Sequence, residues 1–334
     1  MKKNIAVIAG GYSSEYIVSI KSAEGICSFL DREKFNVYTV VITKDKWMVV
    51  FPETNTEEIP VDKNNFSFFA DGRKILFDFA WITIHGTPGE DGLLQGYFDM
   101  LGIPYSCCGV LAAALTFNKY CCKQYLAGFG IKSAKAVLLK KNGGINTGKL
   151  TKELGLPLFV KPNDGGSSFG TTKVTAPDRL KAAITMAFEE GSEVIVESFM
   201  EGMEVTCGCY KTDKIFVFPV TEVVSKNEFF DYEAKYTGDK VEEITPARIS
   251  KELSGKIQAM TAKIYDLVGA KGIIRADYII SVKGEIGLLE VNTTPGMTAT
   301  SFIPQQIRAA RLNIMDVLTD IIDHISSSCL QSHS

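Results

Sequence analysis

The sequence predicts an α/β protein whose first part contains a parallel sheet and whose last part is α+β. Strand-like apolar runs alternate with a helix-spaced apolar pattern near the N-terminus, which is the order typical of parallel sheets. These elements are the strands expected at 4–9, 36–42 and 79–84 and the helix expected at 15–30. Residues 203–224 alternate polar and apolar side chains, and a strand–turn–strand pattern follows at 272–296, which favours antiparallel pairing there.

Composition and charge narrow the class of protein. The 334 residues carry a formal net charge of −3 and show no basic stripe, so we expect two or three domains and no nucleic-acid partner. Lys2 and Lys3 precede an apolar run, as in a signal peptide, but the run ends at Gly10 and is too short for a secretory core or a membrane span. We therefore expect a buried first strand, a cytoplasmic location and no membrane partner. The eight cysteines lack zinc-type spacing, so we expect reduced thiols that pack as small apolar side chains.

The rest of the chain combines short elements with a glycine- and serine-rich loop. The pattern predicts helices at 111–130, 178–190, 250–268 and 304–326, strands at 136–139, 157–162 and 193–200, and a polar functional loop at 226–247. The glycine-rich loop, KPNDGGSSFG, runs from Lys161 to Gly170 and lacks the spacing of a Walker A loop. Its backbone N–H groups can still form an anion-binding nest. A flexible surface turn is the alternative interpretation of this loop by itself.

The strongest local signal is the hairpin at 272–296, in which two β-rich runs flank the turn VKGE. With the turn centred in the middle of VKGE, Asp277 faces Glu290 and Arg275 faces Asn292. Side chains alternate faces along a strand, so these four polar groups share one patch of an otherwise apolar hairpin. A slip of one residue would break this pairing.

Two carboxylates that face each other repel, so this pair needs a cation, a shared proton or the arginine to compensate. A structural salt bridge from Arg275 to Asp277 and Glu290 is one interpretation. Magnesium is the other, because it prefers oxygen ligands and usually takes one or two carboxylates plus substrate phosphates. Asn292 adds a third oxygen, and the glycine-rich loop with its neighbouring lysines offers a place for phosphates. The candidate phosphate contacts are Lys119 and Lys161.

Seven stretches, taken in order along the chain, resemble the ATP-grasp superfamily and, within it, the D-alanine–D-alanine ligase family. They are GGYSSEYIVS at 10–19, HGTPGEDGLLQG at 85–96, GIPYSCCGV at 102–110, KPNDGGSSFG at 161–170, FFDYEAKY at 229–236, RADY at 275–278 and LEVNTTPGMTATS at 289–301. The resemblance implies a three-domain ATP-grasp fold with an N-terminal parallel α/β domain. The implied units are a substrate-side domain at 1–118, a central ATP-grasp subdomain at 119–200, and a C-terminal ATP-grasp domain at 201–334 with the metal site and a mobile loop.

The same resemblance implies a reaction, which joins two D-alanines into the dipeptide used for peptidoglycan. ATP phosphorylates the carboxylate of the first D-alanine, and the amine of the second attacks the resulting D-alanyl phosphate. The family further implies two magnesium ions, for which manganese can substitute, and a homodimer. The sequence EAKY around Tyr236 favours D-alanine as the second substrate. A D-lactate or D-serine ligase and a nucleotide-binding relative without catalysis are the alternatives.

Residue roles follow from the resemblance, motif by motif. The implied metal ligands are Asp277, Glu290 and Asn292, and the implied ATP contacts are Lys119, Lys161, Glu197, Phe199, Met200, Glu204 and Lys235. Glu15 matches the residue that holds the first ammonium group, in a triad with Ser167 and Tyr236, which position the second substrate. The remaining matches are Arg275 at the acyl phosphate, His85 near the first substrate, and Ser301 with the Gly296 backbone at the second carboxylate. Without the family, Glu15 would be interpreted as a first-turn helix acid, and Phe199 and Met200 as core residues.

Overall fold

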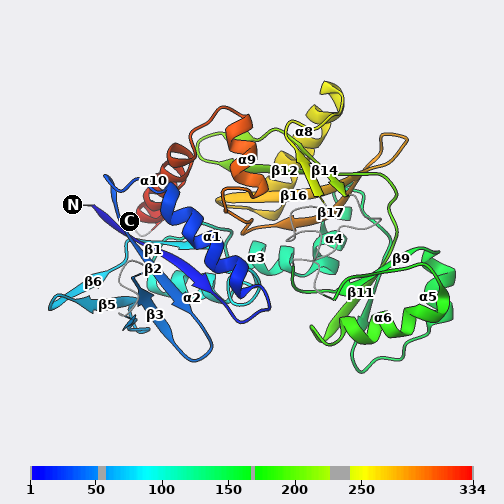
Figure 1. Cartoon of the computed structure of the whole chain (residues 1–334), viewed down its shortest axis with the longest axis horizontal. Helices are drawn as coiled ribbons and strands as arrows, with labels where there is room; N and C mark the ends of the chain where they lie inside the picture. The colour runs from blue at the N-terminus through cyan, green and yellow to red at the C-terminus, as the bar shows by residue number, and fades with distance from the viewer. Residues whose placement is uncertain (1, 52–57, 167–169, 226–240, 333–334) are drawn as a thin grey trace.

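The computed structural model describes residues 2–51, 58–166, 170–225 and 241–332 of the chain. Three main sheets form in chain order, together with a small two-stranded sheet. Figure 1 shows that the third sheet, which is last in the sequence, lies between the other two. Sites between sheets are therefore built from segments far apart in the sequence.

The first sheet has the order β4-β3-β2-β1-β7. Its predicted strands are confirmed as β1 (Lys3–Gly10), β2 (Phe35–Ile42) and β7 (Phe79–Ile82), which pair in parallel, and α1 (Tyr16–Phe29) follows β1. Four short strands were not predicted, because each is too short to show a periodic pattern. They are β3 (Trp47–Val50) and β4 (Glu58–Pro60), which extend the sheet antiparallel, and β5 (Ser67–Ala70) and β6 (Arg73–Leu76), which form the small sheet.

The single helix expected at 111–130 is wrong, because the chain breaks at Asn118. Two helices occupy this stretch, α3 (Val110–Phe117) and α4 (Lys119–Ala127), and α2 (Leu93–Leu101) precedes them. Asn118 has an extended backbone with φ −80° and ψ 99°, and its side chain accepts a hydrogen bond from the Cys121 N–H at 2.9 Å. Asparagine is a favoured N-cap residue, so α4 begins afresh at Lys119.

The second sheet is antiparallel, with the order β10-β9-β11-β8. Its elements are β8 (Ala136–Lys140), α5 (Thr147–Leu154), β9 (Leu158–Pro162), β10 (Thr172–Val174), the short helix η1 (Pro177–Arg179), α6 (Leu180–Ala187) and β11 (Glu193–Ser198). The predicted strands are present, and α5 and α6 bury apolar side chains against the sheet. The strands β9 and β11 carry Lys161 and Glu197, which places both residues on one sheet.

The third sheet is also antiparallel, as the alternation at 203–224 predicts, with the order β15-β14-β12-β16-β17 and β13 beside β12. Its elements are β12 (Met203–Lys211), β13 (Ile215–Val217), β14 (Thr221–Ser225), β15 (Val241–Ile244), α8 (Lys251–Val268), β16 (Ile273–Ile280) and β17 (Ile286–Asn292). The expected loop at 226–247 is wrong over β15, which pairs with β14. Residues 226–240 of that loop lie outside the described residues, and 245–247 follow β15.

Two helices, rather than one at 304–326, end the described chain. They are α9 (Phe302–Ala309) and α10 (Ile314–Ser332), and Arg311 between them has a positive φ of 59°. A residue in this left-handed conformation interrupts an α-helix. The apolar pattern continues past Arg311, but the chain forms two helices there instead of one. Within the described ranges, no helix is long and apolar enough to cross a membrane.

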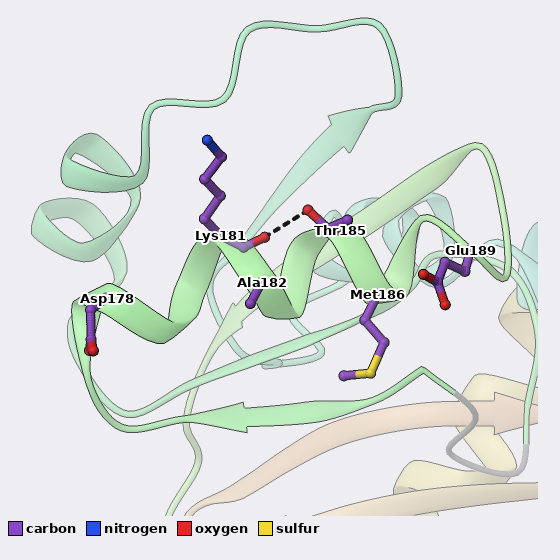
Figure 2. A pocket seen from close by; sticks show the side chains of 6 residues that line it. All are labelled: Asp178, Lys181, Ala182, Thr185, Met186 and Glu189. Carbon is purple, nitrogen blue, oxygen red and sulfur yellow. Dashed lines mark hydrogen bonds between the residues drawn. The ribbon is translucent and has the colours of Figure 1, made fainter.

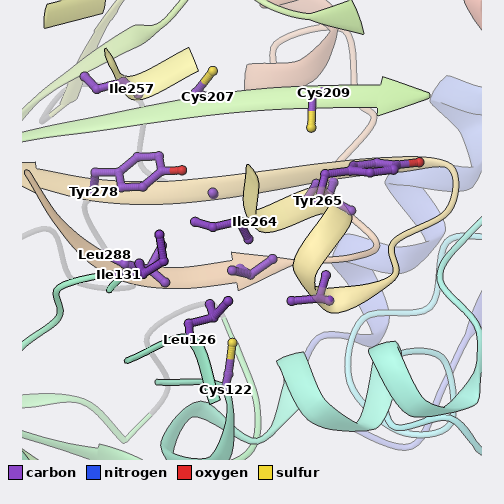
Figure 3. Close-up of a cluster of buried hydrophobic side chains, with 14 of the residues drawn as sticks. Cys122, Leu126, Ile131, Cys207, Cys209, Ile257, Ile264, Tyr265, Tyr278 and Leu288 are labelled. Atoms are coloured by element: carbon purple, nitrogen blue, oxygen red, sulfur yellow. The ribbon is translucent and has the colours of Figure 1, made fainter. Parts of the chain in front are cut away.

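Shared apolar clusters pack the first and third sheets together, whereas the second sheet has a cluster of its own. One cluster packs α3 and α4 against the third sheet and α8, and Figure 3 shows its Cys122 and Leu126 below the strands that carry Cys207 and Tyr278. Another cluster packs β1 and α1 against α9 and α10. All eight cysteines are free thiols, and five are buried as the composition predicts. The domain boundaries at 118/119 and 200/201 stay a prediction.

Gly25 gives a test of how tightly α1 packs against the loop that follows β17. A Cβ atom at Gly25 would lie 2.1 Å from the carbonyl oxygen of Met297, which is a backbone atom that cannot rotate away. We expect Gly25→Ala to lower the free energy of unfolding by about 1–3 kcal/mol, measured by denaturant titration. The control is Gly255→Ala in α8, where a Cβ would meet no atom within 4 Å and should stabilise by up to about 1 kcal/mol. Equal stability of Gly25→Ala and wild type would contradict the packing.

Candidate active site

The predicted pairing of the β16–β17 hairpin is confirmed. Asp277 lies opposite Glu290, and Arg275 lies opposite Asn292. Nearer the turn, however, Tyr278 pairs with Leu288, so the turn is centred differently from the prediction. A β-bulge between Asp277 and Tyr278 then shifts the register and restores the predicted pairs. Bulges redirect side chains next to functional sites, and this one places four polar groups together.

The Asp277 carboxylate accepts hydrogen bonds from three side chains. Arg275 binds it in a bidentate manner, with Nε 2.9 Å from Oδ1 and Nη2 2.8 Å from Oδ2. The Asn292 amide donates to Oδ2 at 3.1 Å, and the Thr206 hydroxyl donates to Oδ1 at 2.5 Å. The salt-bridge interpretation expects Arg275 to pair with both Asp277 and Glu290. The structure contains the pair with Asp277. Thr206 was missed, because its place opposite Asp277 depends on the register of β12 against β16.

Lys161 and Glu197 form a buried cluster on the second sheet, and a third residue, Lys123, joins it. The Lys161 ammonium lies 2.8 Å from the Glu197 carboxylate, and Lys123 from α4 contacts the other carboxylate oxygen. Burial by itself would raise the pKa of Glu197, but the two ammonium groups outweigh it and hold the pKa at about 2. Burial lowers the pKa of Lys161, but Glu197 and Glu290 outweigh burial, so the net shift is upward. Lys161 is therefore influenced both by Glu197 on its own sheet and by Glu290 on the hairpin.

Lys119 lies at the start of α4 and contacts the glycine-rich loop, because its ammonium donates to the carbonyl oxygen of Gly165. Asn163, a fully buried residue of that loop, holds the two segments together. Its carbonyl oxygen accepts from the Lys119 N–H at 3.1 Å, and its side-chain oxygen accepts from the Tyr120 N–H at 2.9 Å. The broken helix at Asn118 is therefore what brings Lys119 to the loop.

A pocket joins the loop to the hairpin. It is lined by Glu90, Thr116, Phe117, Lys119, Gly165, Gly166, Glu290, Val291, Asn292 and Thr293. Two predicted metal ligands and one predicted phosphate contact thus face one space. Another pocket lies on the solvent side of α6, where Figure 2 shows Lys181, Thr185 and Met186, and it contains none of the predicted site residues.

The predicted substrate-side residues also converge. Glu15 is buried, and a Cβ at Gly166 would lie 3.0 Å from its Oε1, so the glycine-rich loop passes directly over it. His85 Nε2 lies 3.3 Å from the Ser22 hydroxyl. Burial lowers the pKa of His85, although Glu15 acts in the opposite direction. Burial therefore favours the neutral form of the imidazole.

Ser301 lies at the N-terminus of α9, and Gly296 packs against it. The Ser301 hydroxyl accepts from the Thr298 N–H at 3.1 Å instead of capping the helix. A Cβ at Gly296 would lie 3.1 Å from this hydroxyl. The side chain of Ser301 therefore does not cap α9.

The predicted adenine-side residues lie where the second and third sheets meet. Phe199 packs against Phe159 at 5.9 Å, and the Lys173 ammonium lies 4.6 Å from its ring. Met200 reaches Gly287 of β17, because a Cβ there would lie 2.8 Å from the methionine sulfur. Glu204 lies on β12, and its negative charge contributes to the raised pKa of Lys161. Ser167, Lys235 and Tyr236 lie outside the described residues.

Besides Thr206, three further residues near the site were not predicted individually: Glu90, Lys123 and Asn163. Lys123 could have been found, because it follows Lys119 by four residues and so shares its helix face. Glu90 belongs to the quoted stretch HGTPGEDG and accepts from the Gly86 N–H at 2.8 Å. Burial raises the pKa of Glu90 to about 7, and the charge of Glu15 adds to the shift. Its carboxyl is therefore partly protonated near neutral pH.

Comparison with known proteins identifies relatives over nearly the whole chain. The models described as "D-ala D-ala ligase N-terminus" and "D-ala D-ala ligase C-terminus" match residues 4–108 and 126–323. The chain is 61% identical over 324 residues to the D-alanine–D-alanine ligase of Parabacteroides distasonis, covering 97% of each chain. It matches the structure of the VanG D-Ala:D-Ser ligase from Enterococcus faecalis with a TM-score of 0.85, 35% identity, and coverage of 97% of this chain and 100% of that one. The ATP complex of the D-alanine–D-alanine ligase from Bacillus anthracis matches with a TM-score of 0.77, 28% identity and coverage of 99% of each chain.

Glu90 predicts a pH dependence of stability. A raised pKa means that the folded state favours the protonated carboxyl, so stability is lost as the pH rises from about 4.5 to about 7. We expect Glu90→Gln, which cannot ionise, to raise Tm by about 1–3 °C at pH 8.5 and by less at pH 5. Calorimetry without nucleotide measures this difference. Glu24→Gln, which removes an exposed carboxylate from α1, is the control and should change Tm equally at both pH values; the same result for Glu90→Gln would contradict the shift.

Proposed function

Because the chain belongs to the D-alanine–D-alanine ligase family, we propose that ATP and magnesium bind between its glycine-rich loop and the β16–β17 hairpin. The reaction of this chain is the ATP-dependent joining of two D-alanines, which supplies peptidoglycan synthesis. The observation that carries the proposed location is the pocket lined by Lys119, Gly165, Glu290 and Asn292. It joins an anion-binding loop to oxygen ligands for a divalent cation.

The nucleotide is held along the seam between the second and third sheets. Lys119 and Lys161 contact its phosphates, and Lys235 reaches them from the segment that lies outside the described residues. Phe199 and Met200 line the adenine slot, while Glu197 and Glu204 hold the adenine and the ribose. The support is that β9, β11 and β12 place Lys161, Glu197 and Glu204 within one electrostatic environment.

Asp277, Glu290 and Asn292 fit magnesium. Two carboxylates and one amide oxygen lie on paired strands, and among the described residues no three His, Cys, Asp or Glu side chains are grouped so that they could hold a metal ion by themselves. Such an incomplete protein shell suits magnesium, which usually takes several ligands from water and substrate phosphates. We propose two ions, replaceable by manganese, which neutralise charge on the transferred phosphoryl group.

The remaining residues orient the two amino acids. Glu15, buried beneath Gly166, holds the ammonium group of the first D-alanine, with neutral His85 beside it. Arg275 is held rigid by Asp277, so its donors are fixed toward the acyl phosphate and the oxyanion that follows, where preorganised donors are most effective. Ser301 and the N-terminus of α9 receive the second carboxylate. Ser167 and Tyr236 complete the triad with Glu15. As the second substrate, D-alanine is preferred over D-lactate and D-serine.

We also propose a homodimer in the cytoplasm. The exposed face of α2 and α3 carries Leu93, Met100 and Leu111, which are 63%, 82% and 80% exposed. Val110 is 42% exposed and packs beside Gly96, so exposed apolar side chains of α2 and α3 lie on neighbouring helices. Apolar surfaces of this kind are typical of contacts between subunits. Eight free thiols agree with a reducing compartment that supplies ATP.

Glu290→Gln tests the proposed metal site. The variant keeps the shape of the side chain but removes the charge opposite Asp277, so we expect magnesium-dependent ADP formation with D-alanine to fall by at least about 100-fold. The control is Glu285→Gln in the turn of the same hairpin, where the carboxylate is 63% exposed and pairs with Lys132. It should retain wild-type activity. An active Glu290→Gln enzyme with an unchanged requirement for magnesium would refute the assignment.

Leu111→Glu tests the proposed dimer. A charge in the centre of the apolar surface of α2 and α3 should convert the dimer to a monomer in size-exclusion chromatography with light scattering. Val282→Glu, which places the same charge on a side chain that is 93% exposed in the hairpin turn, should leave the dimer intact. A wild-type protein that is monomeric at micromolar concentration would contradict the proposal.

A further inference from the structure

Lys123 is the most deeply buried charged side chain of the cluster around Glu197. The side chains of Lys123, Glu197 and Lys161 are 3%, 4% and 13% exposed. Lys123 contacts Oε1 of Glu197, whereas Lys161 contacts Oε2. One carboxylate therefore contacts two lysine side chains, and Glu290 of the hairpin also acts on both of them.

Three separate elements build this cluster. Lys123 projects from α4, Lys161 from β9 and Glu197 from β11. Lys161 pairs across the sheet with Ile195, two residues from Glu197, so both side chains lie on the face toward α4. Burying three charges is expensive, and such clusters persist only when each charge is compensated. A neutral apolar contact would have packed α4 at lower cost, which points to a role beyond packing.

The role becomes apparent when Lys161 contacts a phosphate, as in the proposed function. To contact a phosphate, the Lys161 ammonium must either interact with the phosphate and Glu197 at the same time or move away from Glu197. If Lys161 were the sole partner, its departure would leave a buried carboxylate without a counter-charge, which is strongly unfavourable. Because Lys123 holds the other oxygen, Glu197 stays compensated wherever the Lys161 ammonium moves.

We propose that Lys123 is a positioning residue for ATP, which keeps Glu197 neutralised and thereby frees Lys161 for the phosphates. It acts through Glu197 and touches neither the transferred group nor the metal. The inference rests on the proposed contact between Lys161 and phosphate. A merely structural lysine would affect the binding of adenosine and of ADP to the same extent, whereas a lysine in this role affects ADP alone.

The experiment measures the Kd of ADP with magnesium and the Kd of adenosine, both by competition with a fluorescent nucleotide. In Lys123→Met, we expect the Kd of ADP to rise at least about tenfold and the Kd of adenosine to change less than about twofold. Lys123→Arg keeps the charge and should restore ADP binding. Lys181→Met, which removes one exposed positive charge from α6, controls for net charge and should change neither Kd.

The double variant Lys123→Met/Glu197→Gln isolates the route of the effect. In this variant no buried carboxylate needs compensation, so Lys161 is again free to contact the phosphates. The ratio of the Kd of ADP to the Kd of adenosine should therefore equal the ratio measured for Glu197→Gln alone. The pair is neutral and of similar volume, so it should fold even if Lys123→Met does not. Failure of the second substitution to restore the ratio, or an equal loss of adenosine and ADP binding, would overturn the proposal.

Lys161→Met separates this inference from the proposed function. If it loses ADP binding while Lys123→Met does not, the phosphate contact stands and the role of Lys123 is wrong. If Lys161→Met binds ADP normally, the proposed phosphate contact fails, and the inference fails with it.

Discussion

The central constraint in this molecule is that several carboxylates lie close together, partly out of water, and each needs a compensating positive charge. Asp277 lies opposite Glu290 across two paired strands, and Glu197 is nearly fully buried. The fold answers with one arginine for Asp277 and two lysines for Glu197. Coulomb attraction is strong at these separations in a low-dielectric interior, so the cations cannot be placed loosely. These charged groups are carried by β9, β11, α4 and β16.

The arrangement of the sheets makes such a cluster possible. The third sheet lies between the first and the second, so its strand β17 faces α4 and the glycine-rich loop. Helices α3 and α4 belong to the third sheet by packing, although they precede the second sheet in the sequence. The break at Asn118 begins α4 at the point where Lys119 can reach Gly165. The pocket in this space is lined by Glu90, Lys119, Gly165 and Glu290, which come from segments far apart in the sequence.

The hairpin shows both how far a sequence argument reaches and where it stops. The predicted pairs of Asp277 with Glu290 and Arg275 with Asn292 are present. Two deviations from the predicted hairpin cancel each other at these pairs. The turn is centred elsewhere than predicted, and the bulge after Asp277 shifts the register back. Period-2 alternation specifies which residues share a face, but a bulge depends on packing against neighbouring strands. The prediction was therefore correct at the site and wrong at the turn.

The sequence by itself determined the three parallel strands of the first sheet, the antiparallel character of the later part, the glycine-rich loop and the carboxylate hairpin. These are properties of periodicity, glycine content and local spacing, which act over a few residues. The tertiary structure alone decided that Lys123 joins Glu197, that Thr206 binds Asp277, and that Glu90 lies beside the loop with a raised pKa. Those contacts join residues 70 or more positions apart in two of the three cases. They depend on how sheets and helices pack, and no local pattern records the distance between two segments that meet only after folding.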